Sequence, residues 1–412
     1  MGLEAGSTWS ASHGTVGADK KGINTYDFGS RAILVMQERA TARVPEHLPT
    51  PGGPWTIKFE PTPVCNFDCH TCPYRVANEV QLNSFMQLRQ ADKTQDLGLS
   101  EEQVMQTLED LKRGGHTRGV HWSGGGEPLS WPYIMQGIMK SGEFAQVSIQ
   151  TNGTRLDKLT ANQKALGAIR LISVSIYGDS DESYQRVTGV PGFTRVKENV
   201  GDLVQLRNRL GLKTAINAKI LVTPRNYMGL FNTIETYQTL GVDTISVRET
   251  QNYNIGSDEE RPESVELSFS QKDELLTEIA TNHAGDKLLA SFAKTLTRGP
   301  KEVLPTSHCF NATHSHNATI TPEGEVYLGD PESGVKEYCI GNINQNSWSE
   351  AWGSPKHIEV VKKMDEKQIA GGCPLDLCRH HIANSAVDMY LASEHLTPVE
   401  ADKVMENFGA FL

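Results

Sequence analysis

Three cysteines in the first quarter of the chain carry the most specific chemical pattern. Cys65, Cys69 and Cys72 form C-x3-C-x2-C directly after residues 55–60, which alternate like a strand. Three thiolates spaced in this way can surround one four-iron cluster and leave its fourth iron open to another ligand. A zinc site is the alternative, and it would recruit His70 because structural zinc normally takes four ligands. A redox dithiol would need only the C-x-x-C pair.

The other four cysteines all lie in the last quarter of the chain, at Cys309, Cys339, Cys373 and Cys378. Four thiolates can close a second four-iron cluster completely. Buried structural thiols and a closed zinc site are the alternatives. Several histidines could serve the zinc site: His308, His314, His316, His380 and His381. The total of seven cysteines is odd and the residues are grouped, which favours metal ligation over a disulfide framework.

A glycine-rich turn follows the second predicted strand. Gly125, Gly126, Glu127 and Pro128 stand about 50 residues after the cysteine loop. Glycines let the backbone approach a ligand closely, and the amides and carbonyls of such a turn can hold an ammonium or carboxylate group. Alone, a turn of this kind would often be only a tight strand–helix connection.

Strands and helices alternate across the middle of the chain. The predicted strands are residues 55–60, 119–123, 146–150, 171–176, 214–222 and 244–247. The predicted helices between them are residues 100–113, 132–139, 156–166, 194–210 and 227–240. This order predicts an α/β fold with a parallel sheet, open or curled into a partial (β/α)6 TIM-like barrel. In such folds the chemistry lies at the carboxyl ends of the strands.

Changes in this pattern divide the chain into four parts. Residues 1–54 are predicted to form an N-terminal extension with a short helix at 31–42, and residues 55–250 the barrel. Residues 251–297 are predicted to form a helical linker with two helices within 267–297. Residues 298–412 are predicted to form a smaller module with a hairpin of strands 318–321 and 325–328.

Composition narrows the class of protein. The 412 residues include 39 Lys plus Arg against 50 Asp plus Glu, a net charge of −11. That balance argues against nonspecific binding to nucleic acid or to an anionic membrane surface. No run reaches the roughly 18 apolar residues of a membrane span, and residues 32–36 are too short for a signal-peptide core. We therefore expect a cytoplasmic protein.

The cysteine loop and the glycine turn together resemble the radical S-adenosylmethionine (SAM) superfamily over about residues 55–250. The resemblance implies a [4Fe-4S] cluster on Cys65, Cys69 and Cys72 whose open iron chelates the amino and carboxylate groups of SAM. It implies that the Gly-Gly-Glu-Pro turn holds the methionyl ammonium. It also implies that one electron cleaves SAM and releases a 5′-deoxyadenosyl radical, which abstracts a hydrogen from the substrate.

Further cofactor residues follow from the same resemblance. Asn152 lies in a Thr-Asn-Gly turn, and Ser175 would approach the ribose or carboxylate of SAM. Arg186 resembles the arginine that pairs with the methionyl carboxylate, although it could simply be a charge on a helix surface. The residue before the third cysteine is commonly aromatic in the family but is Thr71 here. Phe67 or Tyr74 would then cover the adenine.

The cysteines of the last module resemble the SPASM/Twitch extension of these enzymes. Because only four cysteines are left, the Twitch form with one auxiliary [4Fe-4S] cluster fits better than the longer SPASM form with two. Such a cluster could accept an electron from a substrate radical. It could instead anchor the substrate or brace the fold, and electron transfer is the role we expect.

The substrate is predicted to be small and polar, such as an amino sugar or aminocyclitol, which is dehydrogenated or epimerised. Tyr177, Arg248 and Glu249 end predicted strands, and we expect them to point toward the reactive centre. A peptide-modifying maturase is the alternative function. A non-catalytic iron–sulfur carrier would have no use for the glycine turn. The expected protein partner is an electron donor such as flavodoxin or ferredoxin.

Overall fold

The structure is a computed structural model that describes most of the chain. The described residues are 28–41, 43, 48–72, 98–250, 264–297, 306–329, 332–371, 378, 384–385, 387–388 and 391. Cys373, Tyr74, His380 and His381 lie outside them, as does most of the chain after residue 371. Within the described part, no helix is both long and apolar enough to cross a bilayer.

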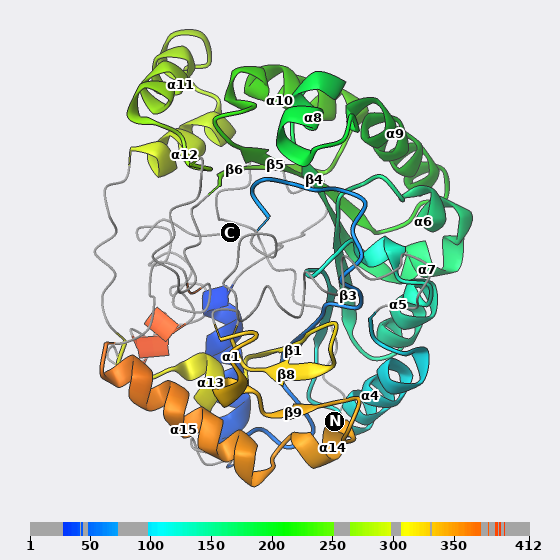
Figure 1. Cartoon of the computed structure of the whole chain (residues 1–412), viewed down its shortest axis with the longest axis vertical. Coiled ribbons are helices and arrows are strands. Elements are labelled where there is room, and N and C mark those ends of the chain that lie inside the picture. Colours follow the sequence, from blue (N-terminus) through cyan, green and yellow to red (C-terminus); the bar gives the residue numbers. More distant parts are fainter. Residues whose placement is uncertain are drawn as a thin grey trace.

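Six parallel strands form the curved sheet that the alternating pattern predicts. They are β1 (Thr56–Phe59), β2 (Gly119–Trp122), β3 (Gln146–Thr151), β4 (Ile169–Ile176), β5 (Ala215–Val222) and β6 (Thr244–Glu249). Neighbours in the chain are neighbours in the sheet, in the order β6-β5-β4-β3-β2-β1. The α/β fold with a partial barrel is confirmed, and its helices lie along the outside of the curve (Figure 1).

The outer helices follow the strands that precede them. They are α4 (Glu101–Gly114), α5 (Ile134–Gly142), α6 (Asp157–Ala161), α7 (Gln163–Ala168), α8 (Asp181–Thr188), α9 (Phe193–Arg209) and α10 (Leu230–Leu240), with the short turns η1 (Pro128–Ser130) and η2 (Tyr227–Gly229). The predicted helix 156–166 is divided at Asn162, because the Asn162 side chain caps the start of α7. Helix α8 has no counterpart among the predicted helices. Its capping box at Ser180 and Ser183 fixes where it begins.

The predicted hairpin is confirmed, and it belongs to the same sheet. Strand β7 (Asn317–Ile320) pairs in parallel with β1, and β8 (Glu325–Tyr327) returns antiparallel to β7. Strand β9 (Gly341–Asn342) completes nine strands within the described chain. The last module is thus attached directly to the first barrel strand.

The remaining helices surround this attachment or follow β6 (Figure 1). They are α1 (Phe28–Thr41), α11 (Phe269–Asn282), α12 (Lys287–Leu296), α13 (Phe310–Thr313), α14 (Trp348–Ala351) and α15 (Pro355–Ile369), with the turn η3 (Lys336–Tyr338). Helices α11 and α12 match the two helices predicted within residues 267–297. The domain boundaries themselves stay predictions.

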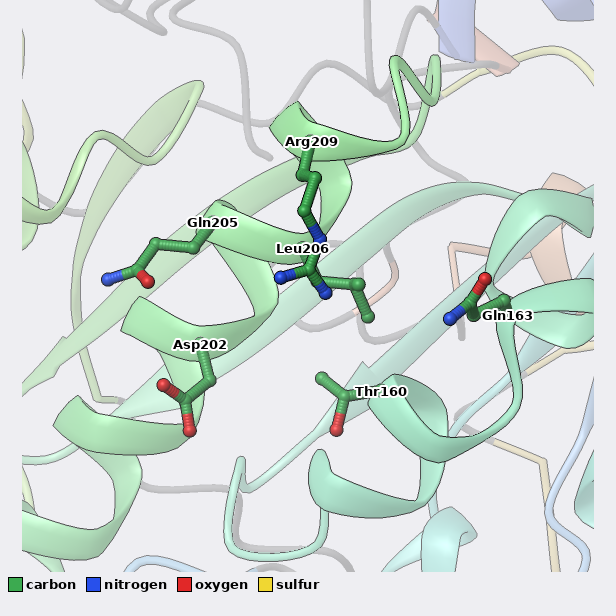
Figure 2. A pocket seen from close by; sticks show the side chains of 6 residues that line it. All are labelled: Thr160, Gln163, Asp202, Gln205, Leu206 and Arg209. Carbon is green, nitrogen blue, oxygen red and sulfur yellow. The ribbon is translucent and has the colours of Figure 1, made fainter.

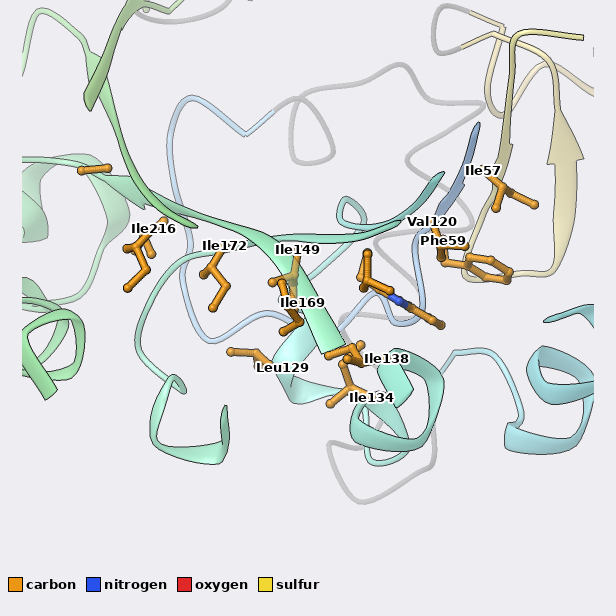
Figure 3. Close-up of a cluster of buried hydrophobic side chains, with 14 of the residues drawn as sticks. Ile57, Phe59, Val120, Leu129, Ile134, Ile138, Ile149, Ile169, Ile172 and Ile216 are labelled. Atoms are coloured by element: carbon orange, nitrogen blue, oxygen red, sulfur yellow. The ribbon is translucent and has the colours of Figure 1, made fainter. Parts of the chain in front are cut away.

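The two faces of the sheet differ in polarity because successive strand residues point to opposite sides. Isoleucines and aromatic residues on one face pack against the helices, as Figure 3 shows for Ile149, which points toward Ile134 and Ile138. Trp122 is fully buried in this core and stacks on Trp131. The opposite face, called here the inner face, carries polar side chains on most strands: Lys58, His121, Ser148, Gln150, Ser173, Ser175, Asn217, Lys219 and Ser246.

Candidate active site

The cysteine loop follows β1 and is fixed against the end of helix α8. The backbone N–H of Asp68 donates to the carbonyl of Thr188 (2.8 Å), and that of His70 donates to Val187 (3.1 Å). Cys69 is buried, whereas Cys65 and Cys72 are partly exposed. None of the three is in a disulfide bond. The loop therefore keeps its thiols available for ligation at the carboxyl end of the first strand.

The glycine turn is hydrogen-bonded to the segment that leads into this loop. The N–H of Gly126 donates to Thr62 (2.8 Å), and the N–H of Glu127 donates to Val64 (2.9 Å). A Cβ on Gly126 would lie 2.2 Å from the carbonyl oxygen of Val64, so only glycine fits this approach. These two amides are therefore used within the protein. The contact of the turn with the ammonium group of SAM stays a prediction.

The side chain of Glu127 stabilises the turn through hydrogen bonds. Its carboxylate accepts hydrogen bonds from the Thr151 hydroxyl (2.6 Å), the Asn152 N–H (2.7 Å) and the Leu129 N–H (3.1 Å). The residue is 2% exposed, and burial raises the pKa of its carboxyl group against the effect of these donors. Glu127 therefore joins the ends of β2 and β3.

Asn152 connects the end of β3 to the cysteine loop. Its side-chain amide donates to Asn66 Oδ1 (2.9 Å) and lies 3.9 Å from Cys65 Sγ, within range of an N–H···S hydrogen bond. Asn152 was expected to contact SAM. That contact stays a prediction, whereas the structure gives the residue a direct link to the Cys65 sulfur.

An aromatic cluster lies behind the cysteine loop. Phe67 is 4% exposed and makes edge-to-face contacts with Tyr177 (6.2 Å between centroids) and Tyr184 (6.4 Å). The ring of Phe67 is packed into this cluster, and its predicted contact with the adenine stays a prediction. The other candidate, Tyr74, lies outside the described residues.

Tyr177 stands next to the cysteine loop as well as at the end of β4. Burial is the main cause that raises its pKa well above the usual range, and the three thiols of the loop add to it. Its phenol is hydrogen-bonded to the side chain of Ser175. Ser175 is on the inner face of β4, as its predicted cofactor role requires. The roles of both residues toward ligands stay predictions.

Lys219 and Gln150 are inner-face residues that the motifs did not identify. The Lys219 ammonium lies 3.3 Å from Gln150 Oε1, and Lys219 is paired with Ser175 in the register of β4 and β5. A lysine within the apolar strand of residues 215–222 was the available signal. Because Lys219 is on the inner face of β5, its charged side chain has access to the centre of the barrel.

Arg186 lies on the outside of the molecule. It is exposed, and its Nε donates to the carbonyl of Arg225 (3.1 Å), while Arg225 donates to the carbonyl of Arg186 (2.8 Å). Pairing of Arg186 with the methionyl carboxylate stays a prediction. The exposure of the side chain agrees better with the alternative, a charge on the surface of α8.

Arg248 and Glu249 point to opposite faces of β6, so they do not both face the reactive centre. The Glu249 carboxylate accepts from the Leu267 N–H (3.0 Å) and pairs with Lys272 (3.0 Å), which attaches α11 to the barrel. The expectation that Glu249 points toward the reactive centre is wrong. Successive residues of a strand point to opposite faces, so Glu249 faces the outer helices when Arg248 faces inward. Arg248 shares the inner face with Ser246, and its predicted role at the reactive centre stays a prediction.

The described cysteines of the last module lie in three separate segments. Cys309 directly precedes α13, and its N–H donates to Asp365 (2.8 Å), which also pairs with His308 (3.0 Å). Cys339 follows the turn η3, and burial raises the pKa of its thiol. Cys378 is in no disulfide bond, and Cys373 lies outside the described residues. Among the described residues, no three His, Cys, Asp or Glu side chains converge on one metal-ion position.

Two family models match the chain. The sequence model of the Radical SAM superfamily matches residues 59–216, and the model of an iron–sulfur cluster-binding domain, SPASM, matches residues 309–378. The chain is a SPASM-type member of the radical SAM superfamily. As a member, it binds SAM, the [4Fe-4S] cluster that holds SAM, and auxiliary iron–sulfur clusters. The SPASM match begins at Cys309 and ends at Cys378.

Curated relatives of this radical SAM protein are distant in sequence. A probable GTP 3′,8-cyclase of Saccharolobus islandicus is 28% identical over 221 residues, which are 53% of this chain and 61% of the relative. The dTDP-4-amino-4,6-dideoxy-D-glucose ammonia-lyase of Streptomyces venezuelae is 25% identical over 209 residues, which are 48% of this chain and 40% of the relative. The chain thus matches about three-fifths or less of their length.

Solved radical SAM structures share the fold. Native anSMEcpe with bound AdoMet has a TM-score of 0.50 at 15% identity, with 86% of this chain and 99% of that chain covered. Streptococcus suis SuiB has a TM-score of 0.50 at 13% identity, with 78% of this chain and 70% of that chain covered. At these identities the likeness concerns the architecture alone.

A hollow of about 260 Å³ lies away from this site, in the outer layer of helices (Figure 2). It is lined by residues of α6, α7 and α9: Thr160, Gln163, Asp202, Gln205, Leu206 and Arg209. None of them is at the carboxyl end of a strand. The hollow therefore has no part in the site built from the cysteine loop and glycine turn.

Proposed function

We propose that this radical SAM enzyme is an oxidoreductase that dehydrogenates or epimerises a small polar substrate, such as an amino sugar or aminocyclitol. The observation that carries the proposal is the polar inner face of the barrel. A barrel interior that serves only packing is filled by branched apolar side chains. Burying polar groups there costs free energy unless they are hydrogen-bonded, so a polar interior suits a ligand rich in hydroxyl and amino groups.

The deeper part of the inner face is hydrogen-bonded within itself. His121 pairs with Ser148 (2.8 Å), and Asn217 Nδ2 donates to both Ser173 (3.0 Å) and Ser246 (3.2 Å). The polar side chains of this deeper layer therefore bond to one another. The inner-face residues nearer the carboxyl ends of the strands, which include Lys219, form an upper layer.

These upper residues are the ones we expect to bind and orient the substrate. Ser175 and Tyr177 come from β4 and the loop after it, Lys219 and Gln150 from β5 and β3, and Arg248 from β6. Each can donate or accept hydrogen bonds toward a hydroxyl group. When bound, SAM and its cluster supply the radical that takes a hydrogen atom, and an auxiliary cluster would supply an electron acceptor for dehydrogenation.

The names of the curated relatives support a small substrate of this class. One is a probable cyclase of GTP, and the other an ammonia-lyase of a dTDP-linked amino sugar. Both names denote small molecules that contain a sugar. We infer the same general class for this chain, with a flavodoxin or ferredoxin as the electron donor and two [4Fe-4S] clusters per chain.

A substrate screen by mass spectrometry tests the proposal. The reconstituted enzyme with reduced flavodoxin is offered aminocyclitols, amino sugars, nucleotide sugars and short peptides, and 5′-deoxyadenosine is quantified. We expect a sugar or cyclitol to increase the amount of 5′-deoxyadenosine. A dehydrogenated product will have lost two hydrogens, and an epimerised product formed in deuterated water will have gained one deuterium. In a separate experiment with substrate deuterated at the reacting carbon, the deuterium should appear in 5′-deoxyadenosine. Stimulation by peptides alone would show a peptide maturase instead.

A further inference from the structure

We propose that Asn152 raises the reduction potential of the SAM-binding cluster by donating a hydrogen bond from its side-chain amide to the Cys65 sulfur. Asn152 Nδ2 lies 3.9 Å from Cys65 Sγ. The backbone N–H of Phe67 also donates to this sulfur, at 3.5 Å. Cys65 therefore receives one donor from its own loop and one from the end of β3. The inference does not depend on which substrate the enzyme takes.

The orientation of the Asn152 amide is fixed by its other contacts. Its Oδ1 accepts from the backbone N–H of Thr154 (3.0 Å) and from the Thr154 hydroxyl (2.7 Å). A backbone N–H can only donate, so the oxygen of the amide must face Thr154 and the NH2 group must face the cysteine loop. The same NH2 group donates to Asn66 Oδ1 (2.9 Å).

The surrounding network leaves Asn152 little freedom to turn away. Asn66 Nδ2 donates to the Thr154 hydroxyl (3.0 Å), which closes a ring of three side chains. The backbone N–H of Asn152 is held by the Glu127 carboxylate. Asn152 is 7% exposed and Thr154 is 3% exposed. In such a low-dielectric site, a satisfied hydrogen-bond network is rigid and its bonds are electrostatically strong.

The direction of the effect follows from charge. Reduction adds an electron to the cluster and increases the negative charge carried by its thiolate ligands. A donor to a ligand sulfur stabilises the more negative state, so it raises the reduction potential. Asn152 acts through Cys65 and is a positioning residue. Its influence should therefore be present before SAM binds, unlike that of a residue whose only role is to contact SAM.

A redox titration of the full-length enzyme without SAM tests this inference. The reduced clusters are followed by electron paramagnetic resonance, and the signal that changes when SAM is later added identifies the SAM-binding cluster. Asn152→Asp keeps the shape and the acceptor for Thr154 but replaces the donor with a carboxylate. At the potential that half-reduces the wild-type cluster, we expect the reduced fraction of this variant to fall several-fold.

Thr154→Val is the matched control, because it removes a hydroxyl from the network while the Asn152 amide and the Thr154 N–H remain. We expect it to titrate like the wild type. If Asn152→Asp has full iron content and the reduction potential of the wild type, the inference is overturned. A change in SAM affinity with an unchanged potential would instead assign Asn152 to SAM contact. An equal shift in Thr154→Val would also overturn it, by showing a merely structural effect. Asn152→Ala, if it retains iron, should shift in the same direction as Asn152→Asp.

Discussion

The carboxylate of Glu127 lies 2.7 Å from the backbone nitrogen of Asn152 and accepts its hydrogen bond. This contact joins the glycine turn after β2 to the turn after β3. Both turns are attached to the cysteine loop, the first through Val64 and the second through Asn66. Glu127 thus fixes the spacing between the expected SAM-binding turn and the cluster ligands.

Substitution of Glu127 tests this arrangement. In Glu127→Gln one acceptor oxygen is replaced by an NH2 group that faces donors, which leaves a buried N–H unsatisfied. We expect a loss of about 1–3 kcal/mol in the free energy of unfolding and weaker SAM binding. Chemical denaturation and isothermal titration with SAM measure the two effects. Wild-type values for both would show that the carboxylate is not needed to hold the turn.

Gly126 should be intolerant of any side chain. A Cβ there would lie 2.2 Å from Val64 O, so Gly126→Ala must displace the segment that leads into the cysteine loop. We expect a cost of about 1–3 kcal/mol and loss of SAM affinity. Gly167→Ala on helix α7 is the control, because the new methyl group would meet only Leu212 at 3.7 Å. That control should be as stable as the wild type or about 0.5–1 kcal/mol more stable.

Iron content tests the division of the cysteines. After anaerobic reconstitution we expect about eight irons per chain, from two four-iron clusters. The Cys65→Ala/Cys69→Ala/Cys72→Ala variant should retain about four irons and form no 5′-deoxyadenosine from SAM. Continued cleavage in that variant would contradict the ligand assignment. About four irons in the wild type, with zinc present, would remove the second cluster.

The neighbours Arg248 and Glu249 should behave differently, because they face opposite sides of β6. Arg248→Gln is expected to reduce product formation about tenfold, the effect of ~1.4 kcal/mol of lost substrate interaction. Glu249→Gln should instead cost about 0.5–1 kcal/mol in stability through the lost ion pair with Lys272. A double-mutant cycle with Lys272→Gln measures that pair. Equal losses of turnover in the two single variants would contradict the assignment of faces.

His357 predicts a pH dependence of stability. It is fully buried, its Nδ1 accepts from the Gly353 N–H (3.0 Å), and burial lowers its pKa from 6.5 to about 3. The folded state thus favours the neutral ring, and unfolding takes up a proton below pH 6.5. This contribution to stability is present above pH 6.5 and is lost as the pH falls toward 3, by about 1.4 kcal/mol at pH 5.5.

Denaturation of the wild type and of His357→Asn at pH 7.5 and 5.5 measures this contribution. Asparagine keeps an acceptor for Gly353 but has no titrating group. The wild type should lose more stability between the two pH values than the variant does. His314, whose pKa burial lowers to about 3, should leave the variant with a residual dependence of the same sign. Identical losses in both proteins would show that His357 does not titrate on unfolding.

Local features of the sequence were sufficient to predict the barrel, and they also give the candidate cluster ligands. Strand alternation predicted β1 to β6 because a sheet with one apolar face imposes a two-residue period. The cysteine spacing and the glycine turn were specific because a small inorganic cluster and a close backbone approach accept few other residue types. These features depend on neighbours in the chain, so they can be read without tertiary contacts.

Contacts between distant segments could not be read in this way. The pairing of β7 with β1, the link from Asn152 to Cys65 and the pair of Lys219 with Gln150 each join different elements. Phe67 was one of two candidates, with Tyr74, to cover the adenine, and nothing in the local sequence shows that Tyr177 and Tyr184 pack against it.

The sequence by itself determined which residues can ligate iron and which turn can approach SAM, because these properties belong to residue type and short spacing. Only the tertiary structure decided that Glu249 attaches α11, that Arg186 is on the surface and that the Asn152 side chain donates to the Cys65 sulfur. The physical reason is that the direction of a side chain depends on the register and packing of whole elements, and those are settled only when the sheet and its helices assemble.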